Sequence, residues 1–268
     1  RIFWLEYIHR LLGRIIGMAL IVPYLIYMCR KRMDRPLTKR MGAACLLVAA
    51  QGMVGWFMVK SGLIDDPRVS PVRLALHLCL AFVLFSLLLW TRLQLIGCTR
   101  IAPAHSKQAI AIRAITAVLG IQIMFGAFVA GTRAGLSYNT FPLMDGQWIP
   151  DGLTQLSPFT RNVLENITMI QFQHRIMAYV VTGFIMLFVW ASWKRALPSQ
   201  RRLLLLLTGA LLFQFSLGVS TLVHGVPITL ASAHQLGALL LLCACIRVCY
   251  GLPLCDLKNT QLNRLSKK

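Results

Sequence analysis

Residues 172–193 read FQHRIMAYVVTGFIMLFVWASW, an apolar run that is interrupted only near its start by Gln173, His174 and Arg175. A helix needs about 20 mainly apolar residues to cross the hydrocarbon layer of a membrane. Six other runs meet this requirement when charges and helix breakers are taken as boundaries. The seven predicted spans are 4–29, 41–60, 72–92, 108–131, 172–193, 202–223 and 229–251. The short alternating segments of a β-barrel are absent, so the sequence predicts an all-α, polytopic membrane protein.

The composition agrees with a protein that lies in lipid. Of the 268 residues, 57% are hydrophobic and 13% are charged, whereas a typical soluble domain has about 25% charged residues. The 28 Lys and Arg against 8 Asp and Glu give a formal net charge of +20. A nucleic-acid-binding protein can be this basic, but it is not also this apolar. The length and the apolar content exclude a small disulfide-stapled secreted domain, although there are eight Cys.

The Lys and Arg residues are concentrated in alternate connections between the predicted spans. The segment 30–40 holds six basic residues and one acid, whereas the connection 60–73 holds three basic residues and two acids. Along the whole chain, nineteen Lys and Arg and two acids fall on one side, which gives that side +17 of the total +20. Because loops on the inner side of a membrane are enriched in Lys and Arg, this charge is a topology signal and not a nucleic-acid-binding surface.

The chain contains an internal repeat. EYIHR at 6–10 opens one span and QFQHR at 171–175 opens another, while Gln-xxx-Gly occurs at 51–55 and again at 214–218. The second half has one span more, 108–131, which precedes its His-Arg helix. We therefore expect two pseudo-symmetric four-helix bundles, with the first helix of the first bundle absent from this chain. The predicted domains are an N-terminal half-bundle at 1–100 and a C-terminal four-helix bundle at 101–268.

Four of the six histidines share one depth in the membrane. His9, His77, His174 and His234 each lie in the first turns of a span that starts on the side with little net charge. Ionisable groups inside a membrane are costly and mark functional sites. Two neutral imidazoles from facing helices form the axial pair of a haem iron, whereas zinc would need a third or fourth ligand in each site. The sequence therefore favours two haems, one held by His9 and His77 and one by His174 and His234.

Charged residues beside these histidines are candidates for further roles. Haem propionates need cationic partners, and Arg10, Arg175 and Arg73 each lie within one helical turn of a candidate ligand; interfacial snorkelling is the alternative for all three. Glu6 precedes His9 by three residues and so shares its helix face, while Gln171 holds the matching place before His174. A carboxylate at a reacting haem edge can relay protons or stabilise a developing cation. Its alternative is a charge favoured by the helix dipole.

These residues resemble haem A synthase of the mitochondrial type. The motifs that carry the resemblance are Glu-x-x-His-Arg at 6–10, Gln-x-x-His-Arg at 171–175, SAHQ at 232–235 and GTRAGLSYNTFPLM at 131–144. The resemblance extends over the whole chain. It implies oxidation of the C8 methyl group of haem O to a formyl group, which gives haem A for cytochrome c oxidase. It also implies that the N-terminal half holds the substrate haem O and its product haem A, whereas the C-terminal half holds a resident haem b.

The resemblance implies a mechanism, a location and partners. Two successive oxidations at the methyl carbon would give a gem-diol that loses water, with the catalytic residue Glu6 moving protons or stabilising a cationic intermediate. The expected location is the mitochondrial inner membrane, with the histidine-bearing helix ends toward the intermembrane space and the basic loops in the matrix. The expected partners are haem O, membrane lipid, an electron donor such as a ferredoxin system, haem O synthase, oxidase-assembly factors and a second copy of the chain.

Two functions from other classes use the same residues. A di-haem b-type electron-transfer cytochrome would need the four histidines but not Glu6, and it would release unmodified haem. A haem transporter or chaperone would need a passage, and its ligands would not all be matched in pairs at one depth. The type of haem that the protein carries separates the three.

Overall fold

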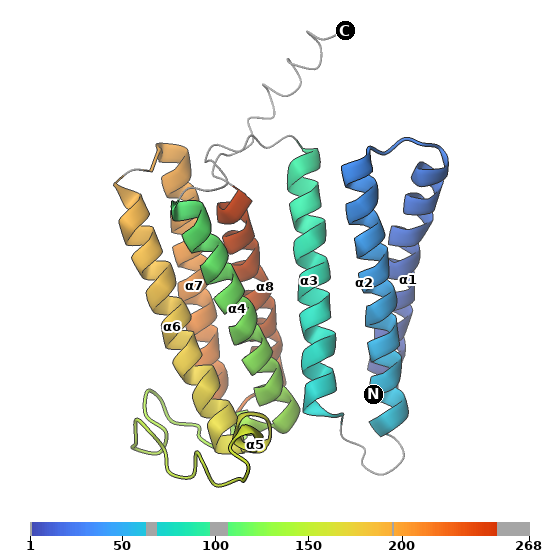
Figure 1. The fold of residues 1–268 in the computed structure, drawn as a ribbon. Helices are drawn as coiled ribbons and strands as arrows, with labels where there is room; N and C mark the ends of the chain where they lie inside the picture. Colours follow the sequence, from blue (N-terminus) through green and yellow to red (C-terminus); the bar gives the residue numbers. More distant parts are fainter. Residues whose placement is uncertain (1, 63–68, 97–106, 195, 251–268) are drawn as a thin grey trace. The chain divides into compact units, whose positions relative to one another are not determined.

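The computed structural model describes residues 2–62, 69–96, 107–194 and 196–250, and these residues are helical apart from one long loop (Figure 1). The helices are α1 (Ile2–Cys29), α2 (Arg35–Gly62), α3 (Pro71–Leu95), α4 (Lys107–Thr132), the 3-10 helix η1 (Ala134–Leu136), α5 (Thr160–Glu165), α6 (Ile167–Trp193), α7 (Pro198–Val223) and α8 (Ile228–Tyr250). Seven of them are long and apolar enough to cross a membrane. The prediction of an all-α, polytopic membrane protein is confirmed.

All seven long helices begin earlier than the sequence predicts, and in two of them a polar side chain caps the early start. Helix α2 begins at Arg35 and not at 41, since the backbone N–H of Leu37 donates to Oδ1 of Asp34 over 2.8 Å. Helix α6 begins at Ile167 and not at 172, since Oδ1 of Asn166 accepts from the backbone N–H groups of Thr168 and Met169. Both side chains accept hydrogen bonds from backbone N–H groups of the first helical turn, which have no carbonyl partner within the helix. The predicted starts were set by hydrophobicity, which ignores such caps.

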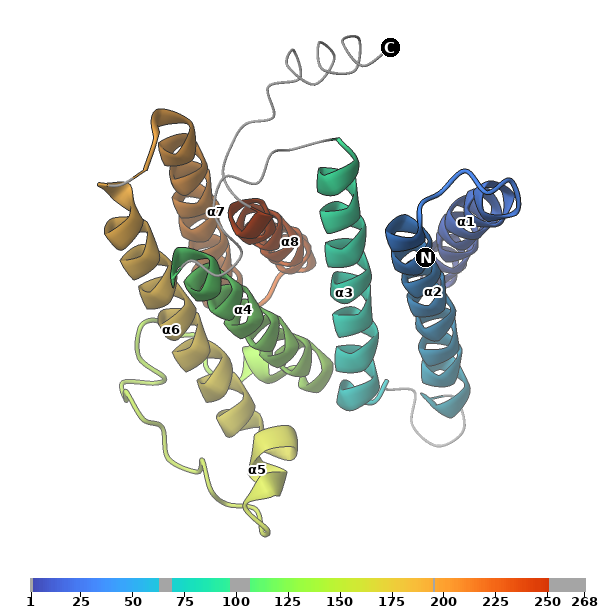
Figure 2. The ribbon, with the colours of Figure 1, turned by 45° about the horizontal axis from the view of Figure 1, so that its top comes forward.

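The chain divides into two compact units, Arg1–Thr91 and Arg92–Lys268. The predicted domain boundary between residues 100 and 101 lies outside the described residues. In the second unit, α4 packs against α6 and α8, and α7 also packs against α6 and α8. These contacts make a closed ring in the order α4–α6–α7–α8, a four-helix bundle in which α6 lies diagonally across from α8 (Figure 2).

The second unit has a core of its own, whereas its outer surface is apolar. Side chains from all four helices of the bundle are fully or almost fully buried, for example Leu119, Ile185, Leu207 and Leu241. On the outside, large apolar side chains such as Trp190 are exposed. Apolar surface on the outside of a helical bundle is the surface that lipid covers. In the first unit, α1 packs against α2.

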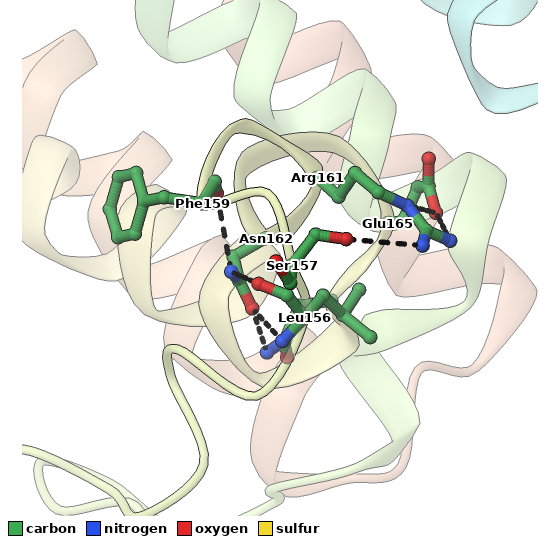
Figure 3. Close-up of polar contacts among 7 residues, drawn as sticks. Leu156, Ser157, Phe159, Arg161, Asn162 and Glu165 are labelled. Carbon is green, nitrogen blue, oxygen red and sulfur yellow. Dashed lines mark hydrogen bonds and ion pairs between the residues drawn. The ribbon is translucent and has the colours of Figure 1, made fainter.

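The loop between α4 and α6 is held by a network of asparagine side chains. The fully buried Asn162 accepts from the backbone N–H of Leu156 over 3.0 Å and donates to the carbonyls of Leu156 and Phe159 (Figure 3). Asn166 donates to Oδ1 of Asn162 over 3.0 Å. This network fixes the loop directly against the start of α6, where His174 and Arg175 lie.

An exposed ion pair lies on the outer face of the same loop. Arg161 donates to Oε2 of Glu165 over 2.6 Å, and this hydrogen bond, together with the charge of the guanidinium, lowers the pKa of the Glu165 carboxyl. Because the pKa is depressed in the folded protein, the stabilisation is complete above the ordinary Glu pKa of about 4 and is lost as the pH falls through the lowered pKa. The pair is therefore fully formed at neutral pH.

Replacement of Asn162 with Ala should loosen this loop. The substitution leaves a buried N–H and two carbonyls without their partner, which costs about 1–3 kcal/mol. Cleavage of the loop by a protease should accelerate by roughly five- to 100-fold, since cleavage follows the population of the open form. The matched control is Arg161→Ala, one residue away on the exposed face of α5, which should change loop stability by only about 0.5 kcal/mol. Equal cleavage rates for the two variants would contradict the role of Asn162.

Candidate functional site

The four candidate histidines lie at matching positions in their helices. His9 and His174 are seven residues after the first residues of α1 and α6, and His77 and His234 are six residues after the first residues of α3 and α8. At 1.5 Å per residue, each lies about 10 Å along its helix. The structure therefore places two histidines in each unit at equivalent depths.

In the first unit, the structure brings His9 and His77 together. Their ring centroids are 6.5 Å apart and the ring planes make an angle of 65°. The ring of His77 lies against α2, and its Nδ1 atom is buried without a hydrogen-bond partner. Two imidazoles at this separation can act as a pair of ligands for one metal centre.

In the second unit, His174 and His234 belong to the diagonally opposed helices α6 and α8. Nδ1 of each ring is buried without a hydrogen bond of ordinary geometry. Nε2 of His234 is 3.5 Å from Nε2 of the Gln214 side chain on α7. The bundle interior thus holds two imidazoles with unused bonding capacity.

Three of the four rings pack against a glycine of the preceding membrane-spanning helix. A Cβ atom added at Gly55, Gly126 or Gly218 would lie 3.1, 3.1 or 2.9 Å from Cε1 of the ring in question. The rings are those of His77, His174 and His234, respectively. Gly55 and Gly218 close the two Gln-xxx-Gly segments that the repeat revealed.

A third Gln-xxx-Gly segment, Gln122 to Gly126 on α4, was missed by the sequence comparison. Nε2 of Gln122 donates to the backbone carbonyl of His174 over 3.1 Å, and its Oε1 atom is buried without a partner. A search for the motif alone, without the requirement that it match in both halves, would have found it.

Glu6 forms an ion pair with an arginine of its own helix. Its Oε2 atom accepts from the guanidinium of Arg10 over 2.8 Å, and both side chains are about half exposed, 57% and 51%. The spacing of four residues places them on one face of α1. Arg10, a candidate propionate partner, is therefore engaged with Glu6 in this structure.

The matching residues of the second unit have a different set of partners. Gln171 donates to the carbonyl of Tyr138 over 2.9 Å, and Arg175 donates to the carbonyls of Tyr138, Thr140 and Leu143. Both side chains are buried, and Nε of Arg175 has no partner. The two halves thus differ both at the Glu6/Gln171 position and in the partners of the arginine that follows. Arg175 donates to backbone carbonyls of the loop, whereas Arg10 donates to the Glu6 carboxylate.

The remaining candidates lie apart from the paired histidines. The guanidinium of Arg73 lies 4.3 Å over the ring of Phe57, a cation–π contact between α3 and α2. His224 is at the end of α7, where its Nδ1 is 2.8 Å from the carbonyl oxygen of Ser220. His105 lies outside the described residues. Across the ranges that the structure describes, there is no group of three or more His, Cys, Asp or Glu that could hold a metal ion.

The comparisons with known proteins point to one family. The family model described as "Cytochrome oxidase assembly protein" (COX15-CtaA) matches residues 1–246. A protein of Nitrosospira multiformis named "Heme A synthase" is 46% identical over 253 residues, which are 92% of this chain and 70% of the relative. A "Heme A synthase" of Parvibaculum lavamentivorans is 42% identical and shares 89% of this chain and 68% of its own length.

A mammalian protein is also similar to the chain. "Heme A synthase COX15" of Bos taurus is 40% identical over 256 residues, which are 90% of this chain and 61% of the relative. Bacterial and animal proteins are thus both similar to the chain, so the similarity does not distinguish a mitochondrial type. The family match covers most of the chain, including all four paired histidines, and the chain belongs to the COX15-CtaA family of cytochrome oxidase assembly proteins.

Proposed function

We propose that this protein is a haem A synthase, which oxidises the C8 methyl group of haem O to a formyl group. The observation that carries the proposal is the pair of histidines at matching depth in each unit of a membrane-embedded bundle. The relatives named for this activity support it. In the first unit His9 and His77 hold the substrate haem, and in the second unit His174 and His234 hold a resident haem b.

The residues present fit haem as a ligand. Two neutral imidazoles provide both axial ligands of a haem iron. The 6.5 Å between the ring centroids of His9 and His77 would leave room for one metal ion held by both rings, which needs about 6 Å for two metal–nitrogen bonds of about 2 Å and roughly 1 Å within each ring. The unpartnered Nδ1 atoms of the other two rings are donors that become more acidic when the opposite nitrogen binds a metal. The bound resident haem supplies one-electron redox chemistry.

Glu6 is the residue that we propose for proton movement at the substrate. It shares the face of α1 with His9, and its Oε2 atom accepts a hydrogen bond from Arg10. In the proposed role this carboxylate moves a proton at the substrate, and Arg10 is its neighbour on the same helix face.

Arg175 and Arg73 are proposed to assist in holding the propionates. The Nε atom of Arg175 is buried without a partner, so one donor of this side chain is available while the others hold the loop. Arg73 is one turn before His77 and is partly buried. Both cations lie near the membrane face that carries little net charge, where they offset the two carboxylates of a haem.

The orientation and the partners follow from the same proposal. The basic connections face the inner compartment, which is the matrix if the protein is mitochondrial, and the paired histidines lie toward the opposite side. A ferredoxin-type electron donor, haem O synthase, oxidase-assembly factors and a second copy of the chain are the proposed protein partners.

Extraction of the pigment from the purified full chain in detergent tests this function. We expect haem b together with haem O or haem A in the extract, and conversion of added haem O to haem A in membranes that contain an electron donor. A chain that carries haem b alone and never converts haem O would be an electron-transfer cytochrome. A chain that binds haem O in exchange with other membranes and releases it unchanged would be a carrier.

A further inference from the structure

The three glycines that contact histidine rings share one geometry. In each case the nearest heavy atoms to an added Cβ are atoms of the imidazole, with Cε1 at 2.9–3.1 Å and Nδ1 at 3.5–3.7 Å. A Cβ at Gly218 would come closer to the ring than real Cβ contacts do, and one at Gly55 or Gly126 would be tighter than most, so the ring must shift to admit a side chain. The same contact recurs between three different helix pairs, which indicates a repeated structural unit and not a chance approach.

The neighbouring glutamine contributes its backbone to the same unit. In an α-helix the carbonyl of residue i accepts from the N–H of residue i+4, so the carbonyl of each glutamine lies beside the glycine that contacts the ring. Each glutamine is one helical turn before the glycine that contacts the ring. Because the glycine has no side chain, the ring can approach the backbone carbonyl of the glutamine. A metal-bound histidine commonly donates its second N–H to a backbone carbonyl, which fixes the tautomer and the ring orientation.

The buried Nδ1 atoms show which ring edge faces the helix. For a Cβ atom added at Gly126, the distance to Nδ1 of His174 is 3.7 Å and the distance to Nε2 is 3.9 Å. For a Cβ atom added at Gly218, the corresponding distances to the His234 ring are 3.5 and 3.6 Å. At Gly55, Nδ1 of His77 is within 3.7 Å and Nε2 is not among the atoms within 4 Å. The Nδ1 side of the His77 ring therefore lies toward the α2 backbone, and in all three rings Nδ1 is at least as close to the glycine as Nε2.

We propose that Gly55, Gly126 and Gly218 are positioning residues for the haem ligands. Each admits the imidazole edge to the helix backbone, so that Nδ1–H faces the carbonyl of the preceding glutamine and Nε2 carries the free lone pair. The proposal rests on the proposed function, because it assigns the three rings to haem iron.

Alanine substitutions with matched controls on the same helices test this proposal. The test variants are Gly55→Ala, Gly126→Ala and Gly218→Ala, and the controls are Gly52→Ala, Gly120→Ala and Gly209→Ala, where an added Cβ meets nothing within 4 Å. Alanine is the better helix former at all six positions, so helix propensity alone would favour every variant. Each full chain is purified in detergent, and haem binding is measured by titration together with the midpoint potential and the low-spin electron paramagnetic resonance signal.

We expect the three test variants to bind haem about tenfold or more weakly, as for other partners that orient metal ligands, with a changed low-spin signal. Gly126→Ala and Gly218→Ala should affect the resident haem, and Gly55→Ala should affect the substrate haem. The three controls should retain the affinity and the signal of the original chain. Equal haem affinity, potential and signal in test and control variants would overturn the proposal.

A double substitution separates ring positioning from simple helix packing. If Gly126 acts through the His174 ring, adding Gly126→Ala to His174→Ala should cause no further loss of haem or thermal stability, because the clash disappears with the ring. A further loss in the double variant would show that Gly126 serves helix packing, and the proposal would be wrong. Full retention of both haems in His174→Ala alone would instead contradict the proposed function, so the two failures are distinguishable.

Discussion

Replacing His174 with Ala is expected to remove one of the two low-spin haem signals and to abolish haem A formation. His174 lies across the bundle from His234 on α8, and a haem iron that loses one of its two axial ligands becomes high-spin and binds weakly. The haem content per chain should fall by about half, because the pair formed by His9 and His77 is untouched. Optical and electron paramagnetic resonance spectra of the purified protein measure both effects.

His224→Ala is the matched control for this experiment. His224 lies at the end of α7 and contacts Ser220, apart from the paired histidines. Its replacement should leave both haem signals and the rate of haem A formation unchanged. Binding of added haem O should persist in His174→Ala, since its ligands belong to the other unit. Retention of both low-spin signals in His174→Ala would disprove the assignment of two sites.

Glu6→Gln should slow haem A formation by about 10²-fold or more, the range for loss of a positioned acid or base. The variant should accumulate haem O or its hydroxymethyl intermediate, because binding by His9 and His77 does not require the carboxylate. Extraction of the haems and their separation by chromatography identify which species accumulates.

Glu165→Gln controls for the loss of an ion pair. It breaks an arginine–glutamate pair with the same spacing of four residues, but on the exposed loop between α4 and α6. Its rate should match that of the original chain. Arg10→Lys tests the partner of Glu6: it keeps a cation four residues away and should keep most of the rate. A normal rate of haem A formation in Glu6→Gln would remove Glu6 from the mechanism.

The membrane spans could be predicted from the sequence because lipid imposes one requirement on all of them. A run of apolar residues long enough to cross the hydrocarbon layer forms a helix whatever its partners are. The starts of α2 and α6 could not be predicted in this way, because Asp34 and Asn166 determine them through hydrogen bonds to the first turn. Such caps depend on side-chain geometry and not on hydrophobicity.

The closeness of His9 and His77 could be predicted, whereas the groups around the histidines could not. The positions of His9 and His77 in the repeat predicted that they form a pair, and their ring centroids are 6.5 Å apart in the structure. Arg175 donates to three backbone carbonyls of the loop. Because every residue has a backbone carbonyl, residue types in the sequence do not indicate which of them an arginine contacts. Gln122 and Gly126 were missed because they lie on α4, which has no counterpart in the first half of this sequence with which it could be compared.

The ring of contacts in the second unit has a consequence for the order in which the protein is made. Helix α4 is the first of the four in the chain and α8 is the last, yet they pack together, with Oγ1 of Thr116 3.2 Å from Sγ of Cys249. Chains fold progressively from the N-terminus during synthesis. The three helices α4, α6 and α7 can associate beforehand, but the bundle closes only when α8 has left the ribosome. His234 lies on α8, so the other three helices are synthesised before both imidazoles of this unit are present to receive a ligand.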